Sequence, residues 1–395
     1  MYWTVYLEGG PKRVNHAAVV VRDKIYSFGG YCTGDDYRAF RPIDIHILNT
    51  ENYRWRVLPA PNRNDPQLKH TPFLRYGHTA VAYGEKIYVW GGRNDEESCN
   101  KLFCFDTAVL KWVSVSARGD TPGARDGHSA CVIDHCMYVF GGFVENIERF
   151  SQDVHALNLQ TFNWTLVQTR GEPPLYRDFH TATAIGHLMY IFGGRGDQNE
   201  PMVDHPDEVY CNKIMYFDTR TSRWHCPKTT GEVPVGRRSH SAFTFGNYLY
   251  IFGGFNGIRC EHFNDIYRFS PETNEWNAVH TFGKPPSKRR RQSCIVVGHR
   301  MFLFGGTSPI SPNYTDVYYN HAGGFDDMDT ADSKLMDHSD MYVLDFAPTL
   351  FMLCLLTVLE NNLDTSTLPD IIKWEIRAMT TNNSITQVDQ CSSSV

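Results

Sequence analysis

The sequence has no apolar run long enough to cross a lipid bilayer. The longest run, Leu350–Leu359, is about half of the ~20 residues that a transmembrane helix needs. The first residues, MYWTVYLEGG, lack the basic start and continuous apolar core of a signal peptide. The net charge is −6, with 38 Lys and Arg against 44 Asp and Glu, so no overall positive field favours nucleic acid. We therefore expect a protein without a membrane segment or a secretion signal.

Catalytic and redox motifs are also missing. None of the 11 cysteines forms a CxxC pair, and without a secretion signal we expect reduced thiols in a cytoplasmic and nuclear protein. The sequence contains no phosphate-binding glycine loop, no nucleophile elbow and no HExxH motif. These absences favour a protein that is not an enzyme and that uses no cofactor.

What the sequence does contain is one unit repeated six times. Each copy ends in a glycine pair, and the pairs are Gly29-Gly30, Gly91-Gly92, Gly141-Gly142, Gly193-Gly194, Gly253-Gly254 and Gly305-Gly306. The second glycine lies 14 residues after a histidine, or after a glutamine in the last copy; these residues are His16, His78, His128, His180, His240 and Gln292. Between them, two β-rich runs flank a short turn, which is typical of a β-hairpin.

A second hairpin follows in every copy except the last. It is marked by a tryptophan six residues after an Asn, Asp or Ser, residue types that stabilise tight turns. The tryptophans are Trp55, Trp112, Trp164, Trp224 and Trp276. Two hairpins make a four-stranded unit, and units of this period build the blades of a β-propeller.

The last copy lacks its fourth strand. Phe351 stands where the tryptophan is expected, inside a different kind of sequence. The strand-like residues 2–8 resemble a fourth strand that no blade precedes. We therefore predict that they complete the sixth blade and close the ring, which removes an exposed sheet edge.

The double glycine, the aromatic strand, the polar turn and the tryptophan together resemble the kelch repeat. The resemblance covers residues 1–346 and implies an all-β fold, a six-bladed kelch β-propeller closed by the N-terminal strand. Kelch propellers include oxidases, actin binders and ubiquitin-ligase receptors, so the fold alone does not determine the function.

Residues on both sides of each first hairpin are predicted to lie on one face, near the central opening. They come just before the repeated His or Gln and just after the glycine pair, and their types vary between copies. Such positions are free for recognition, and Arg, Asp and aromatic side chains are typical of binding sites. The candidates are Asp126, Asp178, Phe179, Arg195, Arg238, Ser239, Phe255, Arg290, Arg291 and Thr307.

The charges in this set are segregated. Arg238, Arg290 and Arg291 enter blades five and six, whereas Asp126 and Asp178 enter blades three and four. A guanidinium group binds a carboxylate through two parallel hydrogen bonds. The arrangement suits an extended peptide C-terminus with a cationic or amide group one or two residues before the carboxylate.

Other interpretations of the basic residues stay open. The run from Lys284 to Arg291 is also typical of a nuclear-localisation or nucleic-acid patch. The arginine three positions before each repeated His or Gln recurs in every copy, which indicates structural bonding. The repeated histidines lie one per blade and cannot converge on one ion, so we predict no metal site.

After Pro348 the chain changes character and two short helices are predicted. Thr349 is a plausible N-cap, and Leu350, Cys354 and Val358 share the face of the first helix. Pro369 begins the second helix, where Leu368, Ile372 and Ile376 share a face. Periodicity alone is equally compatible with packing against the propeller and with an external interface.

The spacing of these residues resembles two docking motifs in order. Leu350, Cys354 and Val358 resemble the BC box, through which receptors bind Elongin C and its partner Elongin B, by placing a helix in an apolar groove. Leu368, Pro369, Ile372 and Ile376 resemble the cullin-2 box, which implies cullin-2 and, through it, a RING partner.

The combination resembles the kelch-domain receptors of cullin-2 ubiquitin ligases. This resemblance implies recognition of C-terminal degrons that end in glycine preceded by Arg, Lys or Gln. Arg238 and Arg291, with Arg290 and Ser239, would hold the carboxylate. Asp126 and Asp178 would hold the preceding cation, in a side-chain pocket with Phe179, Arg195, Phe255 and Thr307.

The chain is thus divided into three parts: the propeller over 1–346, a helical segment over 347–380 and a flexible tail over 381–395. The acidic stretch 307–339 is interpreted as an acidic wall or as disorder. Rival functions are a chromatin- or cytoskeleton-associated scaffold that uses the basic corner, and a kelch-type enzyme.

Overall fold

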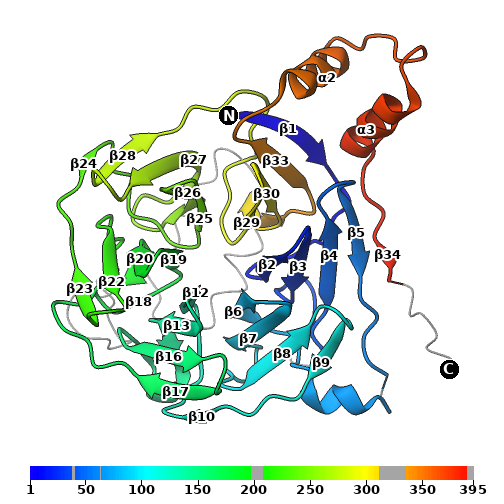
Figure 1. The fold of residues 1–395 in the computed structure, drawn as a ribbon. Coiled ribbons are helices and arrows are strands. Elements are labelled where there is room, and N and C mark those ends of the chain that lie inside the picture. Colours follow the sequence, from blue (N-terminus) through cyan, green and yellow to red (C-terminus); the bar gives the residue numbers. More distant parts are fainter. Residues whose placement is uncertain (38–40, 63, 197–207, 311–334, 389–395) are drawn as a thin grey trace.

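The computed structural model describes residues 1–37, 41–62, 64–196, 208–310 and 335–388. The fold is all-β and fits a β-propeller, with its sheets arranged around a central opening (Figure 1). Two helices, α2 and α3, lie outside the ring of sheets. No helix of the described ranges is long and apolar enough to span a membrane.

Most strands of the described residues belong to six sheets of four or five strands, and the strands of each sheet are named below from the innermost outwards. The first sheet contains β2 (Ala17–Val21), β3 (Lys24–Phe28), β4 (Ile45–Asn49), β5 (Arg54–Val57) and β34 (Thr386–Gln387). The second contains β6 (Tyr76–Tyr83), β7 (Lys86–Arg93), β8 (Leu102–Asp106) and β9 (Lys111–Val113). The third contains β12 (Ser129–Ile133), β13 (Cys136–Phe140), β16 (Val154–Asn158), β17 (Asn163–Leu166) and β10 (Arg118–Gly119).

The remaining three large sheets repeat this order. The fourth contains β19 (Thr181–Ile185), β20 (Leu188–Phe192), β22 (Met215–Asp218) and β23 (Arg223–His225). The fifth contains β25 (Ser241–Phe245), β26 (Tyr248–Asn256), β27 (Glu261–Ser270), β28 (Glu275–Ala278) and β24 (Thr230–Gly231). The sixth contains β29 (Ser293–Val297), β30 (Arg300–Phe304), β33 (Met341–Asp345) and β1 (Tyr2–Leu7).

Smaller pairings lie beside the innermost hairpins. They are β11 (Arg125–Asp126) with β14 (Phe143–Val144) and β15 (Arg149–Phe150), β18 (Arg177–Asp178) with β21 (Arg195–Gly196), and β31 (Thr307–Pro309) with β32 (Leu335–Asp337). Two 3-10 helices occur in the described part, η1 (Pro66–His70) and η2 (Glu145–Ile147).

The predicted polar turns are present. The side chains of Asn49, Asp106, Asn158 and Asp218 each accept a hydrogen bond of 2.9–3.0 Å from the backbone N–H two residues later. This bond holds the tight turn that joins the third and fourth strands of each sheet.

The core lies between neighbouring sheets, and the repeated tryptophans fill it. Each packs edge-on or tilted against an aromatic ring of the preceding sheet, as Trp276 does against Phe192 at 5.2 Å and Trp224 against Phe140 at 5.1 Å. Such aromatic contacts add to the stabilisation from burial. Because one sheet alone leaves both faces exposed, the sheets are stable only as neighbours.

The N-terminal strand completes the sixth sheet. β1 pairs antiparallel with β33, from Tyr2 opposite Asp345 to Leu7 opposite Met341. This is the position at which the sequence predicts a missing fourth strand. The total of six blades and the closure of the ring stay predictions.

Both predicted helices are present. α2 (Leu350–Glu360) begins after Thr349, whose hydroxyl accepts the N–H of Met352 at 3.1 Å, and α3 (Asp370–Thr380) begins after Pro369. Their buried residues join one apolar cluster with β1 and β33; these residues are Leu355, Leu356, Ala378 and Met379. One face of the helical segment therefore packs against the propeller.

The tail differs from the flexible end predicted over 381–395. β34 runs parallel to β5, and the Asn383 side chain accepts the N–H of Trp55 at 3.2 Å. The Asn383 N–H donates to the carbonyl of Glu8 at 2.7 Å. The chain is ordered here because the free edge of β5 offers unpaired backbone groups. Residues 389–395, and residues 311–334 of the acidic stretch, lie outside the described residues.

Candidate ligand-binding site

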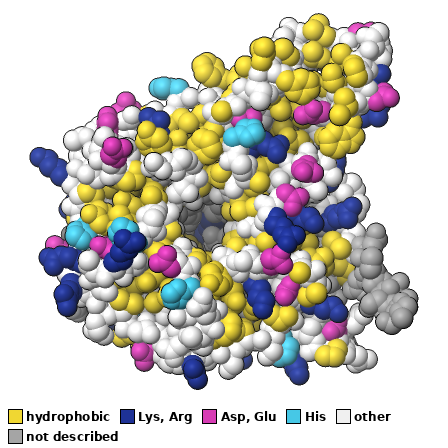
Figure 2. Space-filling model, viewed as in Figure 1, with side chains coloured by type: hydrophobic (Ala, Val, Ile, Leu, Met, Phe, Trp, Pro, Cys, Tyr) yellow, Lys and Arg dark blue, Asp and Glu magenta, His cyan; other side chains and the backbone are white. Residues whose placement is uncertain are grey.

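A cavity of about 130 Å³ lies at the centre of the ring. It is lined by the repeated His or Gln of each copy and by the residue before it: Asn15, His16, Gly77, His78, Gly127, His128, Phe179, His180, Ser239, His240, Arg291 and Gln292. The space-filling view also shows the molecule hollowed at its centre (Figure 2).

The residues before each His or Gln form a circuit of six backbone hydrogen bonds. The N–H of each donates to the carbonyl of the one in the preceding copy, at 2.7–3.3 Å, and Asn15 returns the circuit to Arg291. All six have positive φ, including Asn15, Phe179, Ser239 and Arg291 at 49–65°. This strained backbone is held by the circuit. Because the circuit uses every N–H, side chains around it must recognise a ligand.

The next position outward pairs with the residue after the glycines in every copy. The pairs are Val14 with Tyr31, Tyr76 with Arg93, Asp126 with Phe143, Asp178 with Arg195, Arg238 with Phe255, and Arg290 with Thr307. The sequence prediction that these two groups lie together is confirmed. The charged candidates therefore surround the central cavity.

Three arginines and their aromatic supports form one side of this rim. The guanidinium carbons of Arg238 and Arg290 lie 5.5 and 4.5 Å from the centroid of the Phe255 ring. Arg291 donates to the Tyr31 hydroxyl and lies 5.7 Å from the centroid of that ring. Aromatic faces attract cations and hold the planar guanidinium groups in place.

The electrostatic effect of this cluster is visible at His262. Burial, followed by the charges of Arg290, Arg291 and Arg238, lowers the pKa of His262 to about 2. His262 is therefore neutral at physiological pH and does not add to the positive charge of the rim.

The acidic candidates on the other side differ from each other. Asp178 is buried and accepts two hydrogen bonds from Arg195, Nε–Oδ1 at 3.2 Å and Nη2–Oδ2 at 2.6 Å. Burial, and to a lesser extent Asp178 itself, raises the pKa of Asp126 to about 7, although Arg93 and Arg195 oppose this effect. Asp178 is thus already paired, and Asp126 is charged only in part near neutral pH.

Several predicted pocket residues are not accessible. Phe255 and Thr307 are each 1% exposed. Phe255 supports two arginines from below, and the Thr307 hydroxyl donates to the carbonyl of Met336 at 3.1 Å. Phe179 and Ser239 are partly exposed and line the central cavity.

The sequence reasoning missed Glu208 and Tyr210. Glu208 Oε1 lies 3.7 Å from Arg195 Nη1 and 3.9 Å from Arg238 Nη1. The Tyr210 hydroxyl donates to Glu208 Oε2 at 3.0 Å. These residues belong to a connection outside the repeated hairpin, so no periodic signal marks them.

The recurring arginines have the predicted structural bonds. Five of them donate from Nη1 to the carbonyl of the first glycine of their own pair at 2.7–3.1 Å, as Arg75 does to Gly91 and Arg237 to Gly253. The repeated histidines join neighbouring sheets, for example His240 Nε2 with Thr181 Oγ1 at 2.9 Å. Within the described ranges, no group of His, Cys, Asp and Glu could hold a metal ion.

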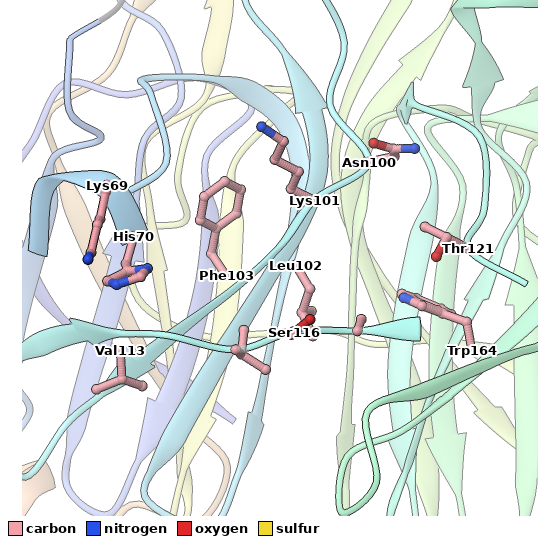
Figure 3. Close-up of a pocket in the computed structure, with 12 residues that line it drawn as sticks. Lys69, His70, Asn100, Lys101, Leu102, Phe103, Val113, Ser116, Thr121 and Trp164 are labelled. Atoms are coloured by element: carbon pink, nitrogen blue, oxygen red, sulfur yellow. The ribbon is translucent and has the colours of Figure 1, made fainter. Parts of the chain in front are cut away.

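A second hollow, of about 300 Å³, lies on the outer rim between the second and third sheets (Figure 3). Lys69, His70 and Lys101 border it, and Phe103 and Trp164 lie among its lining residues. The predicted charged residues do not reach this hollow, which makes the central rim the stronger candidate.

The helical segment has a second, exposed apolar face. Leu350 is 78% exposed, and Phe351, Leu353 and Cys354 are also exposed on α2, whereas Val358 is partly buried. Hydrophobic side chains gather over α2 and α3 in the space-filling view (Figure 2). One face of α2 therefore packs against the propeller and the opposite face is exposed, and its use as an external interface stays a prediction.

The second predicted motif is oriented differently from a free interface. Ile372 and Ile376 are partly buried against the apolar cluster of the propeller. Leu368 is partly buried and Pro369 is exposed. The large exposed apolar residues of α3 are Ile371 and Trp374 instead.

Comparisons with known proteins agree with the repeat pattern. Residues 77–306 match the KLHDC2/KLHL20/DRC7 Kelch-repeats domain, and residues 12–62 match the Kelch motif. The chain is 49% identical over 389 residues to Kelch domain-containing protein 3 of Rattus norvegicus, covering 98% of this chain and 97% of that protein. For the Homo sapiens protein of that name the identity is 48% over 388 residues, with the same coverage.

A more distant relative matches a smaller part of the chain. Host cell factor of Drosophila melanogaster is 28% identical over 287 residues, which cover 68% of this chain and 18% of that protein. The chain therefore belongs to the kelch-repeat family and resembles Kelch domain-containing protein 3 along nearly its full length.

Proposed function

We propose that this protein is the substrate-recognition subunit of a cullin-2–RING ubiquitin ligase. Its kelch sheets form a closed six-bladed propeller that binds C-terminal degrons ending in glycine, preceded by Arg, Lys or Gln. The helical segment binds Elongin B/Elongin C and cullin-2. The protein is not an enzyme itself, uses no cofactor or metal, and works in the cytoplasm and the nucleus.

The closed six-bladed ring is supported by three features. The six-membered hydrogen-bond circuit returns to its first residue, and β1 pairs with β33 from the other end of the chain. In addition, the innermost strand of each large sheet contacts those of both neighbours.

The observation that carries the degron proposal is the cluster of Arg238, Arg290 and Arg291 at the cavity rim. Arginines supported by aromatic rings, in a concave site of low dielectric, bind a terminal carboxylate strongly. Arg291 is partly exposed, Arg238 is 7% exposed and Arg290 is 2% exposed, so Arg290 would act mainly through its charge, while Arg291 and Arg238 would donate the hydrogen bonds.

The exposed face of α2 supports the proposed ligase partners. Leu350 and Cys354 stand free at one helical face, as a helix that enters an apolar groove requires. For α3, cullin contact would involve Pro369 together with the exposed Ile371 and Trp374, since Ile372 and Ile376 face the propeller.

Degron binding is tested by titrating a labelled peptide that ends in Arg-Gly into the full chain, once as the free acid and once as the amide. Arg238→Ala or Arg291→Ala should weaken binding of the free acid by about 1.5–3 kcal/mol for each charged hydrogen bond lost. Arg220→Ala, an exposed arginine on an outer turn, is the matched control. Equal affinity for acid and amide would reject the carboxylate proposal.

Binding of the proposed ligase partner Elongin C is tested by affinity capture. Leu350→Ala with Cys354→Phe should abolish capture of Elongin C, because the helix loses its anchor and gains a clash in the groove. Peptide binding at the central cavity should be unchanged in this variant. Capture that persists would remove the proposed docking face.

The rival nucleic-acid function has a specific weakness. Within the basic run, Arg289 and Arg290 are buried, and Arg289 pairs with Asp340 at 2.7 Å. A steep loss of DNA binding with rising salt would support the chromatin scaffold, and no DNA binding at low salt would remove it.

A further inference from the structure

Glu208 provides a resident carboxylate at the rim of the central cavity. Its Oε1 lies 3.9 Å from Arg238 Nη1 and 3.7 Å from Arg195 Nη1. These distances exceed those of direct hydrogen bonds, so the attraction is electrostatic and Glu208 takes up no donor of either guanidinium, although Arg195 already donates twice to Asp178. Glu208 therefore compensates the two arginines without occupying them.

The backbone around Glu208 is well held. Val209 exchanges two backbone hydrogen bonds of 2.9 Å with Gly196, directly after Arg195. On the other side, the Tyr210 hydroxyl bonds the second carboxylate oxygen, and the Tyr210 ring lies 5.9 Å from the guanidinium carbon of Arg238. The carboxylate thus has a defined position between the two sides of the rim.

Glu208 is more exposed than either of the two acidic residues suggested by the sequence, Asp126 and Asp178. Asp178 is locked in its two bonds with Arg195, and its side chain is 2% exposed. Asp126 is 8% exposed. The Glu208 side chain is 26% exposed. The cation-binding role that the sequence suggested for Asp126 and Asp178 therefore fits Glu208 better.

We propose that Glu208 selects the residue before the terminal glycine: the ligand carboxylate takes over Arg238, and Glu208 pairs with a ligand cation in its place. The ligand carboxylate makes direct, paired hydrogen bonds to Arg238, which are stronger than the longer contact with Glu208. Glu208 then remains beside the ligand as a partly buried anion whose remaining arginine neighbour, Arg195, is already paired with Asp178. A cationic side chain before the glycine supplies a counter-charge, and a neutral or acidic one does not.

This proposal rests on the proposed degron function and makes it more specific. The residue before the glycine lies ~3.8 Å along the chain from it, so its side chain begins beside the carboxylate site. An Arg or Lys there pairs with Glu208. A Gln donates a weaker hydrogen bond, an Ala leaves the anion uncompensated, and a Glu adds repulsion. The expected order of affinity is therefore Arg or Lys, then Gln, then Ala, then Glu.

The test uses the full chain and three acetylated decapeptides with free carboxylates, identical except that they end in Arg-Gly, Ala-Gly or Glu-Gly. Wild type should bind the Arg-Gly peptide about tenfold more tightly than the Ala-Gly peptide, which corresponds to about 1.4 kcal/mol. In Glu208→Gln this preference should fall to about twofold or less, while the Ala-Gly peptide still binds, which shows that the variant is folded. Glu272→Gln, at an exposed turn of the fifth sheet, should keep the wild-type preference.

The outcomes distinguish the role of Glu208 from the proposed degron function. If wild type binds the Arg-Gly acid but not its amide, and Glu208→Gln keeps the full preference for Arg, the role of Glu208 is refuted and the degron function stands. A wild type with no preference for Arg over Ala also refutes it. If wild type binds none of the free acids, the degron function fails and the role of Glu208 fails with it.

Discussion

Two adjacent residues of α2 provide a sharp test of how the helical segment is held. Leu355 is 3% exposed and packs in the apolar cluster shared with β1 and β33, whereas its neighbour Cys354 faces outward. Leu355→Ala removes three carbon groups, which at about 0.8 kcal/mol each amounts to about 2.4 kcal/mol of lost transfer free energy. The cavity left behind raises the cost towards the upper part of the range of about 2.7–5 kcal/mol.

The loss should appear as local opening of α2. Hydrogen exchange measured by mass spectrometry on the full chain should show α2 amides exchanging about fifty-fold faster or more in Leu355→Ala, since each factor of ten corresponds to about 1.4 kcal/mol. Cys354→Ala, the matched control, should change the local stability by no more than about 0.5 kcal/mol. Peptide binding at the central cavity should be unaffected in both variants. Equal exchange in the two variants would refute the packing of this face against the propeller.

Two further predictions concern the tail and the rim. Asn383→Ala leaves the backbone N–H of buried Trp55 without its acceptor and should lower the free energy of unfolding, measured in urea, by about 1–3 kcal/mol. The control Asn382→Ala removes only an exposed hydrogen bond from the Glu8 backbone and should lower it by less than about 1 kcal/mol. Equal losses in the two variants would contradict this prediction. Because burial raises the pKa of Asp126 to about 7 in the folded state, against about 3.9 in the unfolded chain, the folded state binds the proton more tightly and wild type loses stability as pH rises between these values. The thermal stability of Asp126→Asn relative to wild type should therefore increase from about pH 4 to about pH 7 and then level off, and a constant difference would show that the carboxyl titrates normally.

Local features of the chain were predictable because their signals are local. The turn residue Asn49 and its equivalents accept bonds from backbone only two residues away, and Thr349 caps a helix that begins at the next residue. The repeated glycine pairs have positive φ in every copy, a conformation that glycine adopts without strain. For these elements, residue type and spacing are sufficient.

The pairing of β1 with β33 was predictable for a different reason. One repeat lacked a strand and the other end of the chain carried a surplus one, so the mismatch itself indicated the partner. No comparable mismatch indicated β34, because β5, with which it pairs, has the same sequence pattern as the other outer strands. The expectation of a flexible tail failed over 381–388 for this reason.

The sequence by itself determined the repeat, the hairpins, the two helices and the residues that surround the central opening, because each follows from periodicity and turn chemistry over a few positions. Only the tertiary structure decided which of those residues are available. Arg195 is hydrogen-bonded to Asp178 across a strand pair, and Phe255 is buried beneath two arginines. Glu208 lies beside Arg238, and it belongs to a connection that carries no repeat signal. Burial and ion pairing depend on neighbours that are distant along the chain, and a pattern read along one strand does not contain them.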